Sequence, residues 1–181
     1  MLFRSELGTK KRSSVHLLSS RDVEGHLSSL GVDALAPELT VERLGSLLGA
    51  ERAQLKHLLV DQHRIAGIGN AYSDEILWEA RLAPLRITTT LDADEVGRLH
   101  TAMAEVLAAA LSRARDDNYL TVARGDKRGA FQVHRRSGEP CPRCGVAIAS
   151  IYYADSSLQY CPTCQVDGRV YADRRLSRLL R

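Results

Sequence analysis

The sequence contains Cys-Pro-Arg-Cys at residues 141–144 and Cys-Pro-Thr-Cys at residues 161–164, with sixteen residues between the two pairs. Together they hold all 4 cysteines of the chain. A CxxC pair folds into a tight knuckle that points two thiolates at one centre, and the residues between two such pairs supply a hairpin. The spacing therefore predicts one tetrahedral Zn²⁺ site whose ligands are Cys141, Cys144, Cys161 and Cys164.

The predicted site is structural and not catalytic. Four thiolates fill a tetrahedral shell and leave no position for water or substrate. The alternative is a pair of disulfides, but the two cysteines of a CxxC pair rarely bridge outside redox proteins, and nothing in the sequence marks an oxidising compartment. We expect the metal to stabilise a segment that is too small to fold without it.

Composition predicts a soluble globular protein. Hydrophobic residues make up 44% of the chain and charged residues 26%, which is typical of folded domains. No apolar run is long enough to span a bilayer, and the apolar residues at the start precede the basic run Lys10-Lys11-Arg12, the reverse of a secretory signal. We expect a cytoplasmic monomer with no membrane association.

The charge is distributed unevenly along the chain. Residues 1–110 carry a net charge of −3, whereas residues 111–181 carry +6. A basic half favours an anionic partner, most often nucleic acid, although a solvated basic face remains the alternative.

Leucines at helical spacing mark the middle of the chain. Leu44, Leu47 and Leu48 recur at intervals of three and four, and a second set follows from Leu55 to Leu59. A third helix is expected after the turn Gly67-Ile68-Gly69-Asn70, with Asn70 as its N-cap. It should bury Tyr72, Ile76 and Trp78, and Pro84 follows its end.

A further helix is expected from Asp92, because Glu95 three residues later completes a capping box. Its buried side should carry Leu99, Met103, Val106 and Leu107. The predicted fold class is therefore mainly α: a small helical bundle followed by a zinc-binding β-hairpin.

Four segments are expected along the chain. They are a remnant or linker (1–22), a helical domain (23–118), a basic loop with the zinc hairpin (119–165) and a basic C-terminal tail (166–181). Within the first segment, residues 15–18 are expected to form a lone strand or part of a helix. The tail, which carries Leu176, Leu179 and Leu180, is interpreted as a short amphipathic helix that offers a surface for a protein partner.

The turn at residues 67–70 is also a candidate anion site. Backbone N–H groups and the positive end of a helix dipole converge on a point that a phosphate can occupy. Many turns between helices contain glycine without binding anything, so the turn alone is weak evidence. Combined with a basic zinc hairpin, it suggests a clamp on duplex nucleic acid.

Two stretches resemble a known family. Residues 61–77, followed by Pro84-Leu85-Arg86, look like the helix-two-turns-helix motif of the formamidopyrimidine-DNA glycosylase and endonuclease VIII family. Residues 138–145 and 160–165 look like its zinc finger. The resemblance covers roughly residues 20 to 165, and implies a DNA-binding protein that carries one structural Zn²⁺.

Several binding residues follow from the resemblance. Asn70 matches the asparagine that holds a DNA phosphate, next to Gly67 and Gly69 of the turn. Lys56 matches a lysine near the lesion-binding region, although an ordinary exposed helix lysine is the alternative. The expected DNA contacts also include basic residues on either side of the hairpin's start: Arg124, Lys127, Arg128, Arg135 and Arg136.

Two departures from the family pattern qualify this expectation. The family's nucleophile is a proline directly after the initiator methionine, in an N-terminal β-sandwich, whereas this sequence begins Met1-Leu2-Phe3 and none of its 5 prolines is terminal. The family also places an arginine five residues before the third cysteine, where this sequence has Ser156 beside Asp155. Loss of that cation should weaken phosphate binding.

Three functional hypotheses follow. The first is a protein that binds duplex or damaged DNA and lacks glycosylase activity. The second is a residual abasic-site lyase that uses the amine of Met1 or Lys56, and true base excision is less favoured because a flipped base needs an enclosing pocket. The third is a protein-interaction module that uses the knuckle and the C-terminal tail.

Overall fold

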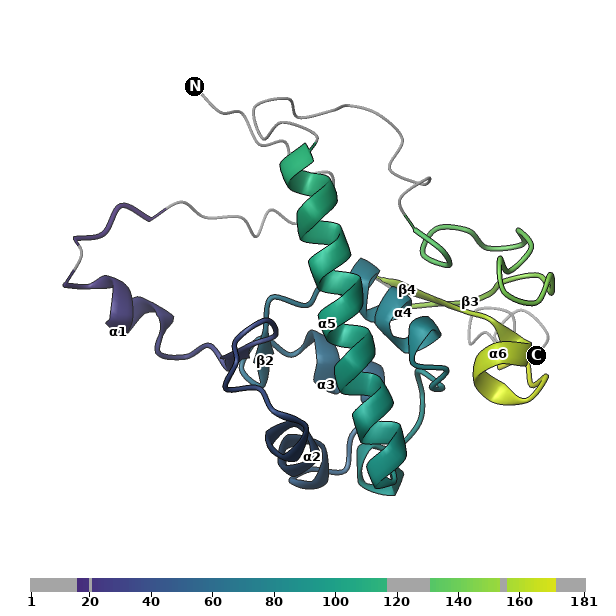
Figure 1. Ribbon diagram of the computed structural model, residues 1–181, viewed down its shortest axis with the longest axis horizontal. Coiled ribbons are helices and arrows are strands. Elements are labelled where there is room, and N and C mark those ends of the chain that lie inside the picture. Colours follow the sequence, from purple (N-terminus) through teal and green to yellow (C-terminus); the bar gives the residue numbers. More distant parts are fainter. Residues whose placement is uncertain (1–15, 20, 117–130, 154–155, 172–181) are drawn as a thin grey trace.

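The computed structural model describes residues 16–19, 21–116, 131–153 and 156–171. Figure 1 shows the long helix α5 crossing the helical body, with helix α1 on one side and the pair β3–β4 with α6 on the other. In chain order the elements are α1 (Val23–Leu27), β1 (Val32–Asp33), α2 (Val41–Gly49), α3 (Leu55–Val60), β2 (Ile65–Ala66), α4 (Asn70–Glu79), the 3₁₀ turn η1 (Thr88–Thr90), α5 (Ala93–Asp116), β3 (Ala149–Tyr152), β4 (Ser157–Tyr160) and α6 (Pro162–Val166).

Helices α2 and α3 follow the leucine pattern of the sequence. Thr40 caps α2, and its hydroxyl accepts a hydrogen bond from the Arg43 N–H at 3.3 Å. Leu44 and Leu48 are buried along α2, and the leucines of α3 are buried against α4. The helical spacing thus predicted both helices and their buried faces.

Helix α4 begins one residue earlier than we predicted. Gly69 is its N-cap and Asn70 is its first helical residue, so the expectation of Asn70 as the N-cap is wrong. The Gly69 backbone is extended and its carbonyl accepts the Ser73 N–H at 3.0 Å. The Asn70 side chain is therefore free of capping and reaches the hairpin instead, where it donates to the Ser157 carbonyl.

Helix α5 starts with the predicted capping box. The Asp92 N–H donates to the Glu95 carboxylate at 3.0 Å, and the Glu95 N–H donates to Asp92 at 2.8 Å. Glu95 also forms an ion pair with Arg86 at 2.8 Å. These contacts fix the start of the helix, whose predicted inner side chains are buried, apart from Val106, which is half-buried.

One apolar core holds the helices together. Its members come from helices α2 to α5 and from the segments that connect them, starting just after β1: Ala34, Leu39, Leu44, Leu48, Leu55, Leu58, Leu59, Ile65, Ile68, Ile76, Leu77, Ala80, Leu82, Val96, Leu99, Ala102, Met103 and Leu107. Strands β1 and β2 form a short parallel pair beside this core. Gly31 precedes the pair, where a Cβ would lie 2.2 Å from the Arg64 carbonyl oxygen, so only glycine fits there.

The last part of the described chain, from residue 131 on, is a zinc-finger hairpin. Strands β3 and β4 are antiparallel, with Ile151 opposite Leu158, and both side chains are buried with Tyr160. The predicted combination of a helical body and a zinc-binding β-hairpin is confirmed, and "mainly α" is an approximation because small sheets occur in both parts.

Some predictions lie outside the described residues. These are the roles of Arg124, Lys127 and Arg128 and the tail helix around Leu176, Leu179 and Leu180. Of residues 15–18, expected as a lone strand or part of a helix, the described residues 16–18 are neither. The four segment boundaries stay predictions. Within the described ranges, no helix has the length and apolar character needed to cross a membrane.

Candidate metal centre and nucleic-acid interface

The four cysteines converge on one point. Their sulfur atoms all lie within 4.8 Å of one another, and all four thiols are free of disulfides. The first knuckle closes through a hydrogen bond from the Gly145 N–H to the Cys141 carbonyl at 2.8 Å. The second opens helix α6, with Cys161 as N-cap and Pro162 in the first turn. Four such sulfurs, none of them in a disulfide, are the donor set of a structural Zn²⁺ ion.

The acidities of these thiols also fit a cation at the centre. Although burial opposes ionisation of Cys141, hydrogen bonds from the Trp78 indole and from backbone N–H groups lower its pKa to about 6. Burial and the neighbouring thiols raise the pKa of Cys164 to about 12. Negative charge can therefore form at one sulfur but not accumulate at several unless a cation neutralises it, which is what Zn²⁺ supplies when it binds.

The first knuckle is fastened to the end of helix α4. The Trp78 indole N–H lies 3.4 Å from the Cys141 sulfur, and the Arg143 guanidinium stacks 3.9 Å above the centre of the Trp78 ring. Arg143 also donates to the Trp78 carbonyl at 2.8 Å and pairs with Glu79 at 3.0 Å. The orientation of the zinc site is thus tied to α4.

The segment that leads into the hairpin is anchored by a single carboxylate. Glu75, buried in the middle of α4, accepts the backbone N–H groups of residues 132, 133 and 134 at 2.7, 2.9 and 2.8 Å. Three charge-assisted hydrogen bonds satisfy a carboxylate that would otherwise be costly to bury. They also fix where the chain meets the helical body.

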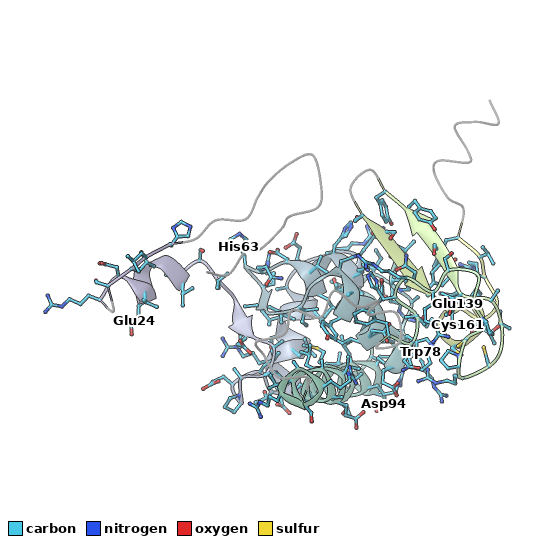
Figure 2. All side chains as sticks on the ribbon, turned by 90° about the horizontal axis from the view of Figure 1, so that it is seen from above. Glu24, His63, Trp78, Asp94, Glu139 and Cys161 are labelled. Atoms are coloured by element: carbon cyan, nitrogen blue, oxygen red, sulfur yellow. The ribbon has the colours of Figure 1, made fainter. Side chains whose placement is uncertain are left out.

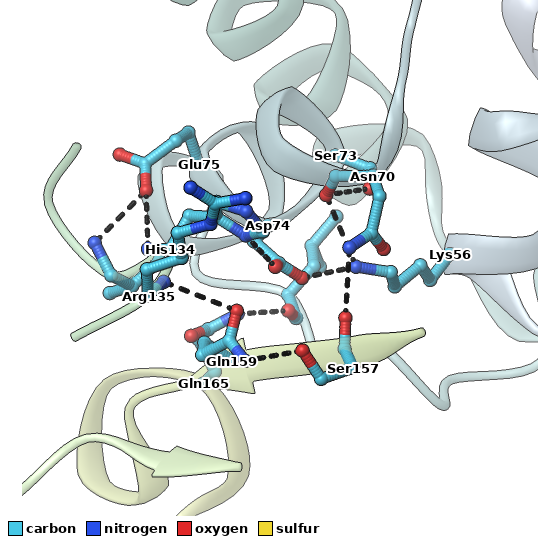
Figure 3. A network of polar contacts seen from close by, with 12 residues as sticks. Lys56, Asn70, Ser73, Asp74, Glu75, His134, Arg135, Ser157, Gln159 and Gln165 are labelled. Atoms are coloured by element: carbon cyan, nitrogen blue, oxygen red, sulfur yellow. Dashed lines mark hydrogen bonds and ion pairs between the residues drawn. The ribbon is translucent and has the colours of Figure 1, made fainter. Parts of the chain in front are cut away.

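Beside Glu75, Asp74 joins two basic side chains (Figure 3). One oxygen of its buried carboxylate contacts His134 Nδ1 at 2.8 Å, and the other forms an ion pair with Lys56 Nζ. Lys56 comes from α3, Asp74 from α4 and His134 from the segment before the hairpin. The contact therefore links three separate parts of the chain inside the protein.

Lys56 is not the exposed helix lysine that one reading of the sequence allowed. Only 6% of the residue is exposed, and Nζ also donates to the Asn70 carbonyl at 3.3 Å. Burial lowers the Lys56 pKa, and the Asp74 carboxylate partly offsets that effect.

The side chain of Gln62 stabilises the glycine turn before α4 through two hydrogen bonds. The Gly67 N–H donates to the Gln62 side-chain oxygen at 3.0 Å, and the Gln62 amide donates to the Ile68 carbonyl at 2.8 Å. Gly67 has φ +96°, a value that side chains disfavour. The turn brings Asn70 to the hairpin, where its amide donates to the Ser157 carbonyl at 3.0 Å (Figure 3).

A pocket of about 450 Å³ lies where α3, the start of α4 and the hairpin meet. Lys56 and Asn70 line it, as does Ser156 at the position where the sequence departs from the family's arginine. The full lining is Gln54, Lys56, His57, Val60, Asn70, Leu85, Tyr153, Ser156, Ser157 and Leu158. Helix α3, the glycine turn and the hairpin thus meet around one cavity.

Two further residues that were predicted to contact DNA, Arg135 and Arg136, lie at the start of the hairpin. The Arg135 N–H donates to Gln159 at 3.3 Å, and its side chain is exposed. The Arg136 side chain pairs with Glu139 at 2.7 Å, which partly neutralises its charge. Neither arginine lines the pocket around Lys56. Their roles in binding stay predictions.

Sequence reasoning missed the acidic pair at the centre of the site. Asp74 and Glu75 belong to a run of six consecutive buried residues, Ser73–Trp78. Two adjacent carboxylates directly before the apolar run Ile76-Leu77-Trp78 were the available signal, since charges are rarely buried without partners. His134, which no pattern in the sequence marked, is buried and bound to Asp74.

Two family models match this chain. Residues 30–119 match the formamidopyrimidine-DNA glycosylase H2TH domain, and residues 138–166 match a zinc finger found in FPG and IleRS. An uncharacterized formamidopyrimidine-DNA glycosylase-like protein of Mycobacterium tuberculosis is 44% identical over 153 residues, which cover 84% of this chain and 95% of that protein.

Longer relatives and solved structures match as well. A formamidopyrimidine-DNA glycosylase of Roseiflexus is 44% identical over 75% of this chain and 51% of its own length. The MutM (Fpg) protein of Thermus thermophilus is 33% identical with a TM-score of 0.69, over 81% of this chain and 57% of that one. Lactococcus lactis Fpg, in complex with DNA containing an abasic site, is 27% identical with a TM-score of 0.72, over 82% and 57%. The chain therefore spans about half the length of the longer relatives that it matches.

Proposed function

Because the chain belongs to the formamidopyrimidine-DNA glycosylase family, we propose that it is a zinc-containing protein that binds duplex or damaged DNA. The observation that carries the proposal is the meeting of the glycine turn, Lys56 and the zinc hairpin around one pocket. A solved relative of the same architecture is described as a complex with DNA containing an abasic site.

The chemistry of the turn suits a phosphate of the DNA backbone. The first N–H groups of α4 have no partner within the helix, and the positive end of the helix dipole lies at the same place. The Asn70 amide has a second hydrogen beyond the one it gives to Ser157. Such contacts carry no base identity, so we expect little sequence preference.

The test is the affinity for a short duplex, measured at several salt concentrations. Asn70→Asp keeps the size of the side chain but places a negative charge beside the bound phosphate, and we expect the dissociation constant to rise by about tenfold or more. Ser46→Asp, on the exposed surface of α2, adds the same charge outside the pocket. Equal effects of the two variants, or no binding to any DNA at low salt, would contradict the proposal.

We also propose that this chain binds abasic DNA without reacting with it. Among the described residues the one lysine is Lys56. Burial lowers its pKa, but the ion pair with Asp74 opposes that effect and favours the protonated amine, which is not a nucleophile. Borohydride should therefore trap no covalent complex between this chain and an abasic duplex that it binds.

A second candidate function is an abasic-site lyase with Lys56 as nucleophile. Burial lowers the Lys56 pKa, and the amine borders the pocket, which favours this reading. A neutral amine would attack C1′ of the open sugar, water would leave, and borohydride would reduce the imine to a stable amine. Trapping that is lost in Lys56→Arg, while DNA binding persists, would establish this activity in place of silent binding. The amine of Met1 lies outside the described residues, and trapping that survives Lys56→Arg but is lost when the terminus is blocked would implicate it.

A further inference from the structure

The candidate zinc site receives a hydrogen bond from outside its own hairpin. The Trp78 indole N–H, near the end of α4, lies 3.4 Å from the Cys141 sulfur. The Cys161 sulfur accepts the Cys164 N–H, also at 3.4 Å, but this donor belongs to the second knuckle itself. The contact between Trp78 and Cys141 thus joins a side chain of the helical body to a metal ligand.

A centre made of four thiolates needs such donors. One Zn²⁺ ion neutralises two of the four negative charges, so the sulfur atoms of the loaded site keep an excess of negative charge. Cys141 and Cys161 are buried, where water does not supply hydrogen bonds to this charge. An N–H group that points at a buried ligand sulfur therefore stabilises the loaded site.

The indole N–H depends on the sulfur in the same way. Only 7% of Trp78 is exposed, and its ring packs with Val133, Cys141, Ile148 and Cys161 in one apolar cluster. A buried indole N–H needs an acceptor, because leaving it without one is costly. The Cys141 sulfur is the acceptor that the structure provides. The geometry therefore favours a specific hydrogen bond over a chance approach of the two atoms.

Arg143 should make the indole a stronger donor. Its guanidinium lies 3.9 Å from the centre of the Trp78 ring, and the Trp78 carbonyl and Glu79 hold it there at 2.8 and 3.0 Å. A cation over the face of an indole draws electron density from the ring nitrogen, which strengthens the hydrogen bond that its N–H donates. Arg143 belongs to the first knuckle, so this knuckle holds in place the ring that donates to its own sulfur.

We propose that Trp78 is a positioning residue for the metal ligand Cys141: its N–H fixes the sulfur and raises the affinity of the site for Zn²⁺, and Arg143 strengthens that hydrogen bond. The alternative is that the indole only fills the space between α4 and the first knuckle. A ring without an N–H would serve that purpose equally well, so experiments can separate the two roles. The inference concerns the retention of zinc and does not depend on DNA binding.

The first experiment observes the hydrogen bond in the unmodified full chain. Trp78 is the only tryptophan, so protein labelled with ¹⁵N gives a single indole cross-peak in a proton–nitrogen NMR spectrum. With ¹¹³Cd²⁺ loaded in place of Zn²⁺, a proton that is hydrogen-bonded to a ligand sulfur acquires a scalar coupling to the metal nucleus. We expect this coupling on the Trp78 indole proton. Its absence would overturn the proposal, because packing alone produces no coupling.

The second experiment measures zinc affinity by competition with a coloured chelator. Trp78→Phe keeps a ring against the knuckle but has no N–H, and the dissociation constant for zinc should rise by about ten- to a hundredfold. Arg143→Met keeps a long side chain but removes the cation, and should raise the dissociation constant by about two- to fivefold. No change in Arg143→Met would overturn the part assigned to Arg143. Circular dichroism of the zinc-saturated variants checks that they are folded.

Tyr160→Phe is the matched control. Tyr160 is fully buried beside Cys161, and its hydroxyl accepts the Tyr171 N–H at 2.8 Å. This variant also removes one buried polar group from an aromatic side chain next to the site, but that group does not bind a ligand sulfur, so zinc affinity should stay within about twofold. Unchanged affinity in Trp78→Phe, or equal losses in Trp78→Phe and Tyr160→Phe, would assign Trp78 to packing alone and overturn the proposal.

Discussion

The buried carboxylate of Asp74 connects separate parts of the chain. It touches Lys56 and His134, which come from different parts of the chain, and its side chain has no exposure to solvent. Breaking a buried ion pair by removing one partner is far more costly than losing a surface pair, because the remaining charge stays buried without compensation.

Asp74→Ala should therefore lower the free energy of unfolding by about 3–5 kcal/mol. Asp94→Ala, at an exposed position in the first turn of α5, should change it by less than about 1 kcal/mol. Urea denaturation of the zinc-loaded proteins measures both. If the double variant Lys56→Met/Asp74→Leu is not more stable than Asp74→Ala, the cost does not come from the uncompensated lysine.

Gly67 offers a second test at the level of one residue. A Cβ at Gly67 would meet no other atom within 4 Å, so any cost of Gly67→Ala comes from its φ of +96°. We expect a loss of about 1 kcal/mol or more in the free energy of unfolding.

Gly97→Ala is the matched control for this change. Gly97 lies within α5 and likewise has open space around a Cβ, but its backbone is helical. Alanine there should raise the free energy of unfolding by up to about 1 kcal/mol. If Gly67→Ala and Gly97→Ala change the free energy of unfolding equally, the positive φ of Gly67 does not disfavour a side chain there.

Among the elements, α4 and the zinc hairpin depend on each other. The helix ends at Trp78 and Glu79, which hold Arg143 of the first knuckle, while its middle holds the chain before the hairpin through Glu75. The main apolar core contains none of the four cysteines. Loss of zinc should therefore disorder the hairpin first and leave most of the helices folded.

Trp78, the only tryptophan of the chain, should report this step. Removal of zinc by a chelator should change its fluorescence, because the ring loses its contacts with Cys141 and Arg143. Far-UV circular dichroism should fall only slightly, and added Zn²⁺ should restore the emission. A complete loss of helical signal on chelation would mean that the body cannot fold without the metal.

The affinity for zinc should fall as the pH is lowered through the neutral range. Burial raises the pKa of both Cys161 and Cys164, the latter to about 12, so zinc must displace their protons, and lower pH favours those protons. Cys141, with a pKa of about 6, joins the competition only near that pH and should steepen the decline below it. A competition titration with a coloured chelator measures this dependence, and an affinity independent of pH would contradict it.

The sequence predicted the helices and the zinc site better than the contacts between segments that are distant in the chain. The capping box of Asp92 and Glu95 formed as expected, because it depends on residues only three apart. The four cysteines converge because their spacing has few other solutions. The pairing of Asp74 with His134 joins positions 60 residues apart, and no local periodicity encodes such a contact.

On the scale of the whole molecule, charge on the hairpin should set the strength of DNA binding. Ser156→Arg adds a cation to the wall of the pocket formed by α3, α4 and the hairpin. We expect tighter binding at low salt and a plot of log affinity against log salt that is steeper by about one unit. Ser46→Arg adds the same charge on α2, outside the pocket. An equal change in slope for both variants would show that the effect of the added charge does not depend on its position in the pocket.

The sequence could identify Ser156 as a departure from the family pattern, but it could not show that this residue borders a cavity. Its position relative to the third cysteine marked a lost cation, yet the cavity beside it depends on Gln54 and His57, which are about a hundred residues earlier in the chain. Figure 2 shows Trp78 beside Cys161 where the helical body meets the hairpin, a proximity that requires the whole fold.

The anchoring of residues 132–134 by Glu75 bears on the order in which the protein folds. These hydrogen bonds close a loop of 57 to 59 residues, and long loops are slow to close before other contacts hold their ends. Glu75 lies on α4, which packs against α3 and α5. The helical body should therefore assemble first and act as a template, and the hairpin should dock afterwards in a slower kinetic phase.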